Sequence, residues 1–355
     1  MRVGLVLGAG GVVGGAWITG GLQALAAETG WDPASADYIV GTSASAMMGS
    51  LLAAGIPPWF MVAHSAGEDF GDLAGADGRP ASSADRSAGA SFTLHRGLPR
   101  LLLGSPELIL HGLRNPRTTP PLGMLLAWGP RGVISTEPLK DVIRRVVPDG
   151  WVDHPNLWLV AADYSTLERV VFGRQGSPTA DLADAVAAAC AIPAFYHPVE
   201  IGDRLYVDGG VNSVSNLDLL AEEELDLVIC LNPMSSLHQP RRLTARVAAT
   251  LRSRAGRQLG KEARVLRERG TKVILVQPTR DDLEVMGSNY MSGGRRNQVI
   301  ETAIETVGAQ LRQPSAARML AKLPPGPPNK VRRPDRPAVE LRQLLAAGRR
   351  TRRSA

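Results

Sequence analysis

One short stretch, residues 38–46, constrains what this chain can fold into more than any other. It reads Tyr-Ile-Val-Gly-Thr-Ser-Ala-Ser-Ala, which is three bulky strand-forming residues, a glycine, and then small residues that favour a helix. Ser43 falls where the strand gives way to the helix. A sharp turn there would lift its hydroxyl above the sheet edge, beside the first N–H groups of the helix. The pattern therefore predicts a nucleophile elbow, with an ordinary serine helix cap as the alternative.

The residues around this serine match the elbow pattern G-x-S-x-G except at its last place. Gly41 and Ala44 are small, which relieves the crowding around a strained serine. Ser45 stands where the pattern has its second glycine, and it is small enough to pack there. We therefore expect Gly41, Ala44 and Ser45 to support the turn, although the departure at Ser45 makes the match less specific.

Composition bounds the class of protein. The chain has 355 residues, of which 44% are hydrophobic and 21% charged, enough for one large α/β domain with additions or for two domains. No apolar run reaches the roughly 18 to 20 residues that span a bilayer. Glycines interrupt the apolar segment at residues 1–27, so we expect a strand, a loop and a helix there rather than a signal peptide. Cys190 and Cys230 both lie in apolar runs, which predicts buried thiols and a reducing, cytoplasmic compartment.

The positive charge is concentrated in the last residues of the chain. Residues 329–355 hold nine Lys or Arg against two acidic residues, a net +7, whereas the whole chain carries +6 and the rest is therefore close to neutral at −1. Such a segment could attract an anionic lipid surface, and a solubilising role is the alternative. Nucleic acid is not an expected partner, because no aromatic residue lies between those arginines.

Strand and helix patterns alternate along most of the chain. Strands are expected at 2–7, 37–41, 157–163, 169–172, 204–207, 227–231 and 272–276, and helical patterns lie between several of them. Strands that alternate with helices indicate an α/β fold, in which a mainly parallel sheet is flanked by helices in three layers.

Residues 59–135 do not follow this alternation. We interpret about 56–135 as a helical and loop cap inserted into a core at 1–221, which 222–322 continue as part of the same fold. Residues 323–355 are rich in proline and then in arginine, and we expect a disordered tail. Apolar residues of the cap would line an acyl pocket or dip into a bilayer surface, and the alternative is an ordinary packed subdomain; they include Trp59, Phe60, Leu101–Leu103, Ile109, Leu110, Leu125, Leu126 and Trp128.

A glycine-rich loop, residues 8–15, follows the first predicted strand. Gly8 and Gly10 fit the dinucleotide-binding pattern G-x-G-x-x-G, but Val13 takes the place of its third glycine, which argues against a nucleotide site. The other interpretation is an oxyanion hole, in which the N–H groups of Gly10, Gly11 and Val12 at a helix N-terminus stabilise developing negative charge. Acyl transfer needs such a loop beside a nucleophilic serine.

Asp208 is the second residue to which the sequence assigns chemistry. It ends a predicted strand, and Gly209 and Gly210 after it let the backbone turn closely and present the carboxylate at the sheet edge. A simple turn aspartate is the alternative. In partnership with Ser43, Asp208 becomes a candidate general base. A free aspartate has a pKa of about 3.9, and burial would raise its basicity.

Four stretches in order resemble the patatin-like phospholipase family: Leu-Val-Leu-Gly-Ala-Gly-Gly-Val-Val-Gly at 5–14, Gly-Thr-Ser-Ala-Ser at 41–45, Cys-Ala-Ile-Pro-Ala-Phe-Tyr-His-Pro at 190–198 and Asp-Gly-Gly at 208–210. The resemblance implies a serine–aspartate dyad, in which Ser43 attacks an ester carbonyl, Asp208 accepts its proton and the glycine loop holds the oxyanion. Water then releases the acyl enzyme. The substrates implied are carboxylic esters of lipids: phospholipids, lysophospholipids or acylglycerols.

The chain departs from that family at three places. Ala9 and Val13 stand where the family's loop, G-G-G-x-[RK]-G, has a glycine and a basic residue, while Gly10, Gly11 and Gly14 are kept. Ser45 replaces the last glycine of the elbow. These departures motivate an alternative function, a non-catalytic relative that binds a lipid or a protein partner.

Histidine chemistry is a further alternative. A Ser–His–Asp triad would require His197 or His238, the two histidines that the pattern places at the carboxyl edge of the sheet. No cluster of His, Cys and Glu has metal-ligand spacing, so we expect neither a metal nor a cofactor.

Overall fold

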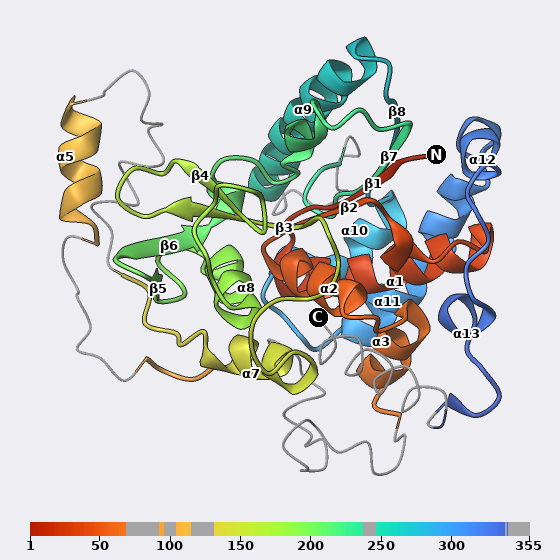
Figure 1. Ribbon diagram of the computed structural model, residues 1–355, viewed down its shortest axis with the longest axis horizontal. Helices are drawn as coiled ribbons and strands as arrows, with labels where there is room; N and C mark the ends of the chain where they lie inside the picture. Colours follow the sequence, from red (N-terminus) through yellow and green to blue (C-terminus); the bar gives the residue numbers. More distant parts are fainter. Residues whose placement is uncertain (69–91, 96–103, 115–130, 237–245, 338, 340–355) are drawn as a thin grey trace.

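The computed structural model describes residues 1–68, 92–95, 104–114, 131–236, 246–337 and 339. An eight-stranded sheet crosses its centre (Figure 1). The strands follow one another as β5-β6-β3-β2-β1-β7-β8, and β4 pairs with β3 off this path. Their bounds are β1 Val3–Leu7, β2 Tyr38–Thr42, β3 Leu157–Asp163, β4 Arg169–Phe172, β5 Val199–Ile201, β6 Arg204–Asp208, β7 Leu227–Leu231 and β8 Lys272–Val276.

The centre of the sheet is parallel and one end is antiparallel. β1 pairs in parallel with β2 and β7, β2 with β3, and β7 with β8, whereas β4 and β6 pair antiparallel with β3. Parallel strands are covered on both faces and read as continuous apolar runs, and all five residues of β1 and of β7 are buried. The predicted α/β fold with a mainly parallel sheet is confirmed.

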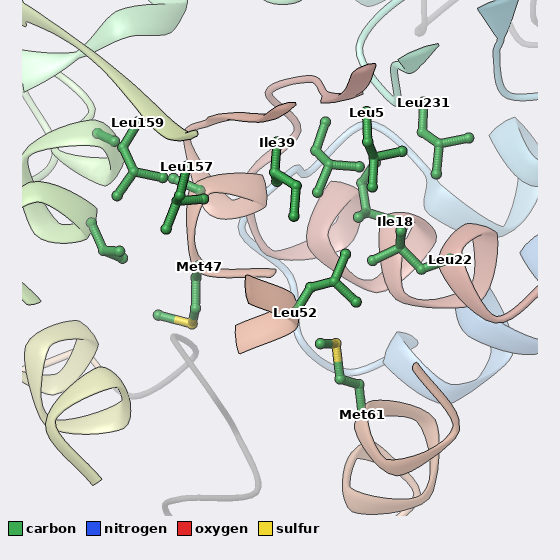
Figure 2. Packing of buried hydrophobic residues seen from close by; sticks show 14 of the residues in the cluster. Leu5, Ile18, Leu22, Ile39, Met47, Leu52, Met61, Leu157, Leu159 and Leu231 are labelled. Atoms are coloured by element: carbon green, nitrogen blue, oxygen red, sulfur yellow. The ribbon is translucent and has the colours of Figure 1, made fainter. Parts of the chain in front are cut away.

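Helices pack on both faces of the sheet. Leu5, Ile39 and Leu157 point from adjacent strands toward α1 and α2, where Ile18 and Leu52 meet them (Figure 2). The opposite face packs against the long helix α9. The helices are α1 Gly11–Thr29, α2 Ala44–Ala53, α3 Pro58–Ser65, α5 Pro106–Arg114, α7 Glu137–Val146, α8 Leu182–Cys190, α9 Arg246–Glu268, α10 Arg280–Met286, α11 Arg296–Leu311, α12 Pro314–Leu320 and α13 Pro328–Val331, with 3₁₀ turns η1 Pro33–Ser35, η2 Gly209–Val211 and η3 Leu217–Leu220.

Two boundaries differ from the sequence prediction. The glycine loop expected at 8–15 is shorter than predicted, because α1 already begins at Gly11. Gly14 lies within this helix and allows close packing, since a Cβ there would lie 3.1 Å from Pro233 Cγ. The expectation of disorder from residue 323 is wrong for its first part. Val331 is buried, and Lys330 Nζ lies 3.6 Å from Asp32, so this segment packs on the body. Residues 340–355 lie outside the described part.

The cap is described only in parts. Of the apolar residues expected to line an acyl pocket, Trp59 is instead buried in α3, where its indole N–H donates to Asn329 O at 2.8 Å. Ile109 and Leu110 belong to α5, which packs on the β3 and β6 end of the sheet through the buried Leu108, and Ile109 is partly buried in the same contact. Leu101–Leu103, Leu125, Leu126 and Trp128 lie outside the described residues.

Close packing of α1 on α11 depends on a glycine, and this yields a stability prediction. A Cβ on Gly20 would lie 2.4 Å from Ile300 O, so Gly20→Ala forces the two helices apart. We expect it to lower the free energy of unfolding by about 1–3 kcal/mol. A Cβ on Gly260, within α9, meets nothing within 4 Å, so Gly260→Ala should raise stability by about 0.5–1 kcal/mol. Urea unfolding measures both, and equal effects would contradict the packing argument.

Candidate active site

Ser43 lies at a strained turn between β2 and α2. Its backbone has φ 61° and ψ −141°, a conformation that L-residues avoid and that costs about 1–3 kcal/mol. Bonds around the turn offset that cost: Ser43 O accepts from Ala46 N at 2.8 Å and from Cys190 Sγ at 3.0 Å. Gly41 allows the helix to fold back over the strand, since a Cβ there would lie 2.6 Å from Ala46 Cα. The local geometry is that of a nucleophile elbow.

Asp208 ends β6 and is held on three sides. Its N–H donates to Ala191 O at 2.9 Å, its Oδ1 accepts from Gly210 N at 2.7 Å, and Ser43 hydrogen-bonds to its side chain. Gly209 passes so close to β3 that a Cβ would lie 2.5 Å from Val160 O. Both site side chains are almost fully buried, Ser43 at 3% exposed and Asp208 at 4%.

Strand register explains why these two residues meet. Thr42 is opposite Val160 on β3, and Asp208 is opposite Ala161, the next residue. β4 pairs with β3 over residues 159–162, so the other edge of β3 receives both β2 and β6. The two strands arrive there from opposite directions and their carboxyl ends meet. Ser43 and Asp208, 165 positions apart in the chain, are thereby brought into hydrogen-bonding contact.

Burial dominates the electrostatics of this pair. Loss of water around the carboxylate raises the pKa of Asp208 to about 6, and the hydrogen bonds from Ser43 and from the Gly210 N–H lower it only in part. A carboxylate with that pKa is ionised at neutral pH and binds a proton more readily than a free aspartate does. The site thus pairs a hydroxyl donor with an unusually basic aspartate.

The glycine loop lies beside this pair and is fastened to the body. Gly8 N donates to Leu231 O at 2.9 Å and Ala9 N to Val214 O at 2.7 Å. Gly11 has φ 61° and would place a Cβ 2.7 Å from Tyr290 O, so only glycine fits there. Gly10 has no room for a side chain either, because a Cβ would lie 2.7 Å from Pro233 Cγ.

The backbone donors of this loop divide into two groups. Val13 N donates to Tyr290 O and Gly14 N to Gly10 O. No acceptor is recorded, among the described residues, for the N–H groups of Gly10, Gly11 and Val12, which lead into the first turn of α1. Free N–H groups at a helix N-terminus are suited to bind negative charge.

The structure explains two of the three departures from the family pattern, Val13 and Ser45, and shows what the third, Ala9, lies against. Val13 is buried in the apolar core, so a basic side chain at that place would lack solvent and a counter-charge. The Cβ of Ala9 lies toward Gly210, 3.6 Å from where a Cβ on that glycine would be. Ser45 makes a hydrogen bond that a glycine could not, from its Oγ to Gly8 O at 2.6 Å.

Other predicted chemistry is not brought to this site. His197 stacks on His95 with ring centroids 3.8 Å apart, and its Nδ1 lies 2.9 Å from Pro198 O. Among the described residues no imidazole acts on Asp208. His238 lies outside them. In the same part of the chain, no group of three or more His, Cys, Asp and Glu side chains could hold a metal ion. Cys190 and Cys230 are free and buried, as expected.

Sequence reasoning missed several supporting residues. Glu262 of α9 accepts from Ser213 Oγ at 2.6 Å and Ser215 Oγ at 2.5 Å, and so shapes the segment that follows Asp208. Asn216, in a left-handed backbone conformation, donates from its Nδ2 to Thr42 Oγ1 at 3.1 Å, next to the elbow. Nothing in the local sequence signals these bonds, since the partners lie 49, 47 and 174 positions apart.

Comparison with known proteins assigns the family. The family model described as patatin-like phospholipase matches residues 5–221, more than half of the chain and both site residues. This chain therefore belongs to the patatin-like phospholipase family. No curated protein matches it. Among solved structures it is similar to VipD from Legionella pneumophila, with 14% sequence identity and a TM-score of 0.40 over 87% of this chain, and it spans 66% of the VipD chain. No helix within the described residues is long and apolar enough to cross a membrane.

The raised pKa of Asp208 predicts a pH-dependent stability. In the unfolded chain this carboxyl loses its proton near pH 3.9, whereas in the folded protein it keeps the proton up to about pH 6. The folded state binds more protons in that window, so its stability falls as pH rises through it. Asp208→Asn removes the buried charge and should exceed wild type in stability by on the order of 2 kcal/mol at pH 8.

That advantage should shrink toward zero as pH falls to 4, which denaturant unfolding at the two pH values measures. Asp153→Asn, at an exposed position, is the matched control and should show no such trend. A difference between Asp208→Asn and wild type that does not change with pH would contradict the burial of an ionised carboxylate.

Proposed function

We propose that this protein is a serine hydrolase of carboxylic esters in lipids. The observation that carries the proposal is the contact between a strained serine and a desolvated, basic aspartate beside a loop with free backbone N–H groups. Membership of the patatin-like phospholipase family supports a lipid ester as substrate. The substrate class we propose comprises phospholipids, lysophospholipids and acylglycerols.

The proposed reaction uses these groups in sequence. Ser43 Oγ attacks the ester carbonyl carbon as Asp208 takes its proton, and the carbonyl oxygen becomes an oxyanion. The N–H groups of Gly10, Gly11 and Val12 stabilise that charge. The C–O bond to the alcohol then breaks, and the alcohol leaves with the proton from Asp208. Water attacks the acyl-serine in the same way, which releases the fatty acid and restores Ser43.

Parts of the cap support contact with a lipid surface. Leu110 and Leu113 of α5 are 48% and 68% exposed, and Leu94 is 71% exposed. Exposed apolar side chains of this size suit the apolar boundary of a bilayer. We propose peripheral contact with an anionic membrane through the cap and the basic C-terminal segment, rather than a purely solubilising role for that segment.

Removing the nucleophile tests the reaction. Ser43→Ala should abolish turnover of a short-chain nitrophenyl ester and labelling by a fluorophosphonate probe, with mass spectrometry placing the wild-type adduct on Ser43. Urea unfolding should show that the variant remains folded, because alanine leaves the rest of the turn unchanged, although the midpoint should fall somewhat as Asp208 loses a hydrogen-bond donor. Wild-type protein that is folded yet neither turns over the ester nor is labelled would instead favour the non-catalytic relative.

The proposed base predicts the acid limb of activity. Asp208 must be ionised to accept the proton, and burial raises its pKa to about 6. The value of kcat/KM for the nitrophenyl ester should therefore fall as pH drops below about 6, with a tenfold loss per pH unit. Any residual activity of Asp208→Asn should lack this limb. A wild-type limb centred near pH 4 would contradict a desolvated aspartate as base.

A further inference from the structure

The hydroxyl of Ser45 joins the helix that carries the candidate nucleophile to the glycine loop. Ser45 is the second residue of α2, two places after Ser43. Its Oγ donates to Gly8 O at 2.6 Å, and its side chain is 0% exposed, so it cannot touch a substrate. The bond spans 37 positions of the chain and connects two elements that the proposed reaction requires to keep a fixed separation.

The other hydrogen bonds of the glycine loop go to elements other than α2. The N–H of Gly8 binds β7 through Leu231 O, and the N–H of Ala9 binds Val214 O, in the segment after Asp208. Among the described residues, the Ser45 bond is the one hydrogen bond recorded between α2 and residues 8–10. It also gives the buried carbonyl of Gly8 a hydrogen-bond donor, and a buried acceptor without a donor is destabilising.

We propose that Ser45 is a positioning residue for the oxyanion donors. Its hydroxyl fixes the distance between Ser43 Oγ and the free N–H groups of Gly10 and Gly11, an inference that rests on the proposed function. Reacting groups must be held to within about 0.5 Å of the productive geometry, and a shift of about 1 Å can cost 100-fold in rate. The serine that departs from G-x-S-x-G is therefore part of this chain's catalytic apparatus.

Substitution of Ser45 tests this role. Ser45→Ala and Ser45→Gly, the second of which restores the family pattern, should each lower kcat for the nitrophenyl ester about 10- to 100-fold. KM should change less than about threefold, because the lost interaction acts on the transition state. Fluorophosphonate labelling should slow in parallel, since the phosphonyl oxygen occupies the same donors. The acid-limb midpoint should stay at the wild-type pH, because Ser45 does not touch Asp208.

Ser50 provides a matched control in the same helix. It is 1% exposed and its Oγ donates to Ala46 O at 2.8 Å, a bond confined to α2. Ser50→Ala loses a buried hydroxyl without any link to the loop, so its kcat should stay within about twofold of wild type. Activities are compared at a temperature well below the lowest melting temperature of the set. If Ser45→Ala fails to fold, Ser45→Cys keeps a weaker donor, and its kcat should lie below wild type.

The outcomes separate the two proposals. If the Ser45 variants keep the wild-type kcat and labelling rate, the positioning role is wrong, while turnover that depends on Ser43 leaves the hydrolase proposal intact. A loss in Ser50→Ala as large as in Ser45→Ala would mean a general effect on α2 and would also overturn the role. A wild-type protein with no Ser43-dependent turnover or labelling would overturn both.

Discussion

The contact between Ser43 and the desolvated carboxylate of Asp208 is the interaction on which the rest of the structure depends. Both ends of it are unfavourable in isolation: the serine backbone is strained at φ 61°, and the aspartate has a pKa raised to about 6 by burial. A protein keeps such groups only where its surroundings over-determine their positions. Here the parallel sheet supplies that rigidity, since its central strands are buried along their whole length.

The positions of Ser43 and Asp208 are set by where the strands end in the sheet and not by their neighbours in the sequence. β2 and β6 end opposite consecutive residues of β3, which sets Ser43 against Asp208. β1 ends beside β2 and β7, and its continuation forms the glycine loop above the same edge. Buried polar residues then bind these segments to the helices: Glu262 of α9 holds the segment after Asp208, and Ser45 of α2 holds the glycine loop. The candidate site thus occupies one edge of the sheet, and the apolar packing lies on its two faces.

This arrangement lowers the stability of the fold and raises the basicity of Asp208. A buried ionised carboxylate lowers the free energy of unfolding above pH 6, and the same loss of water makes Asp208 a stronger base than a free aspartate. Crowding has a similar double role. Gly10, Gly11 and Gly209 leave no room for a side chain. The backbone therefore approaches its neighbours closely enough to place the N–H groups of the loop and the side-chain carboxylate of Asp208. Functional sites commonly retain such locally unfavourable features.

Local pattern in the sequence determined the elements and the candidate groups. Bulky residues before Gly41 predicted a strand, small residues after it a helix, and Ser43 their junction, because these preferences act within a few residues. The Asp-Gly-Gly turn and the glycine loop were predicted in the same way. Only tertiary structure decided that Ser43 meets Asp208, that burial raises the pKa of Asp208, that Ser45 binds Gly8 and that residues 323–333 pack on the body. Each of these depends on strand register or on partners tens to hundreds of positions away, which no local preference encodes.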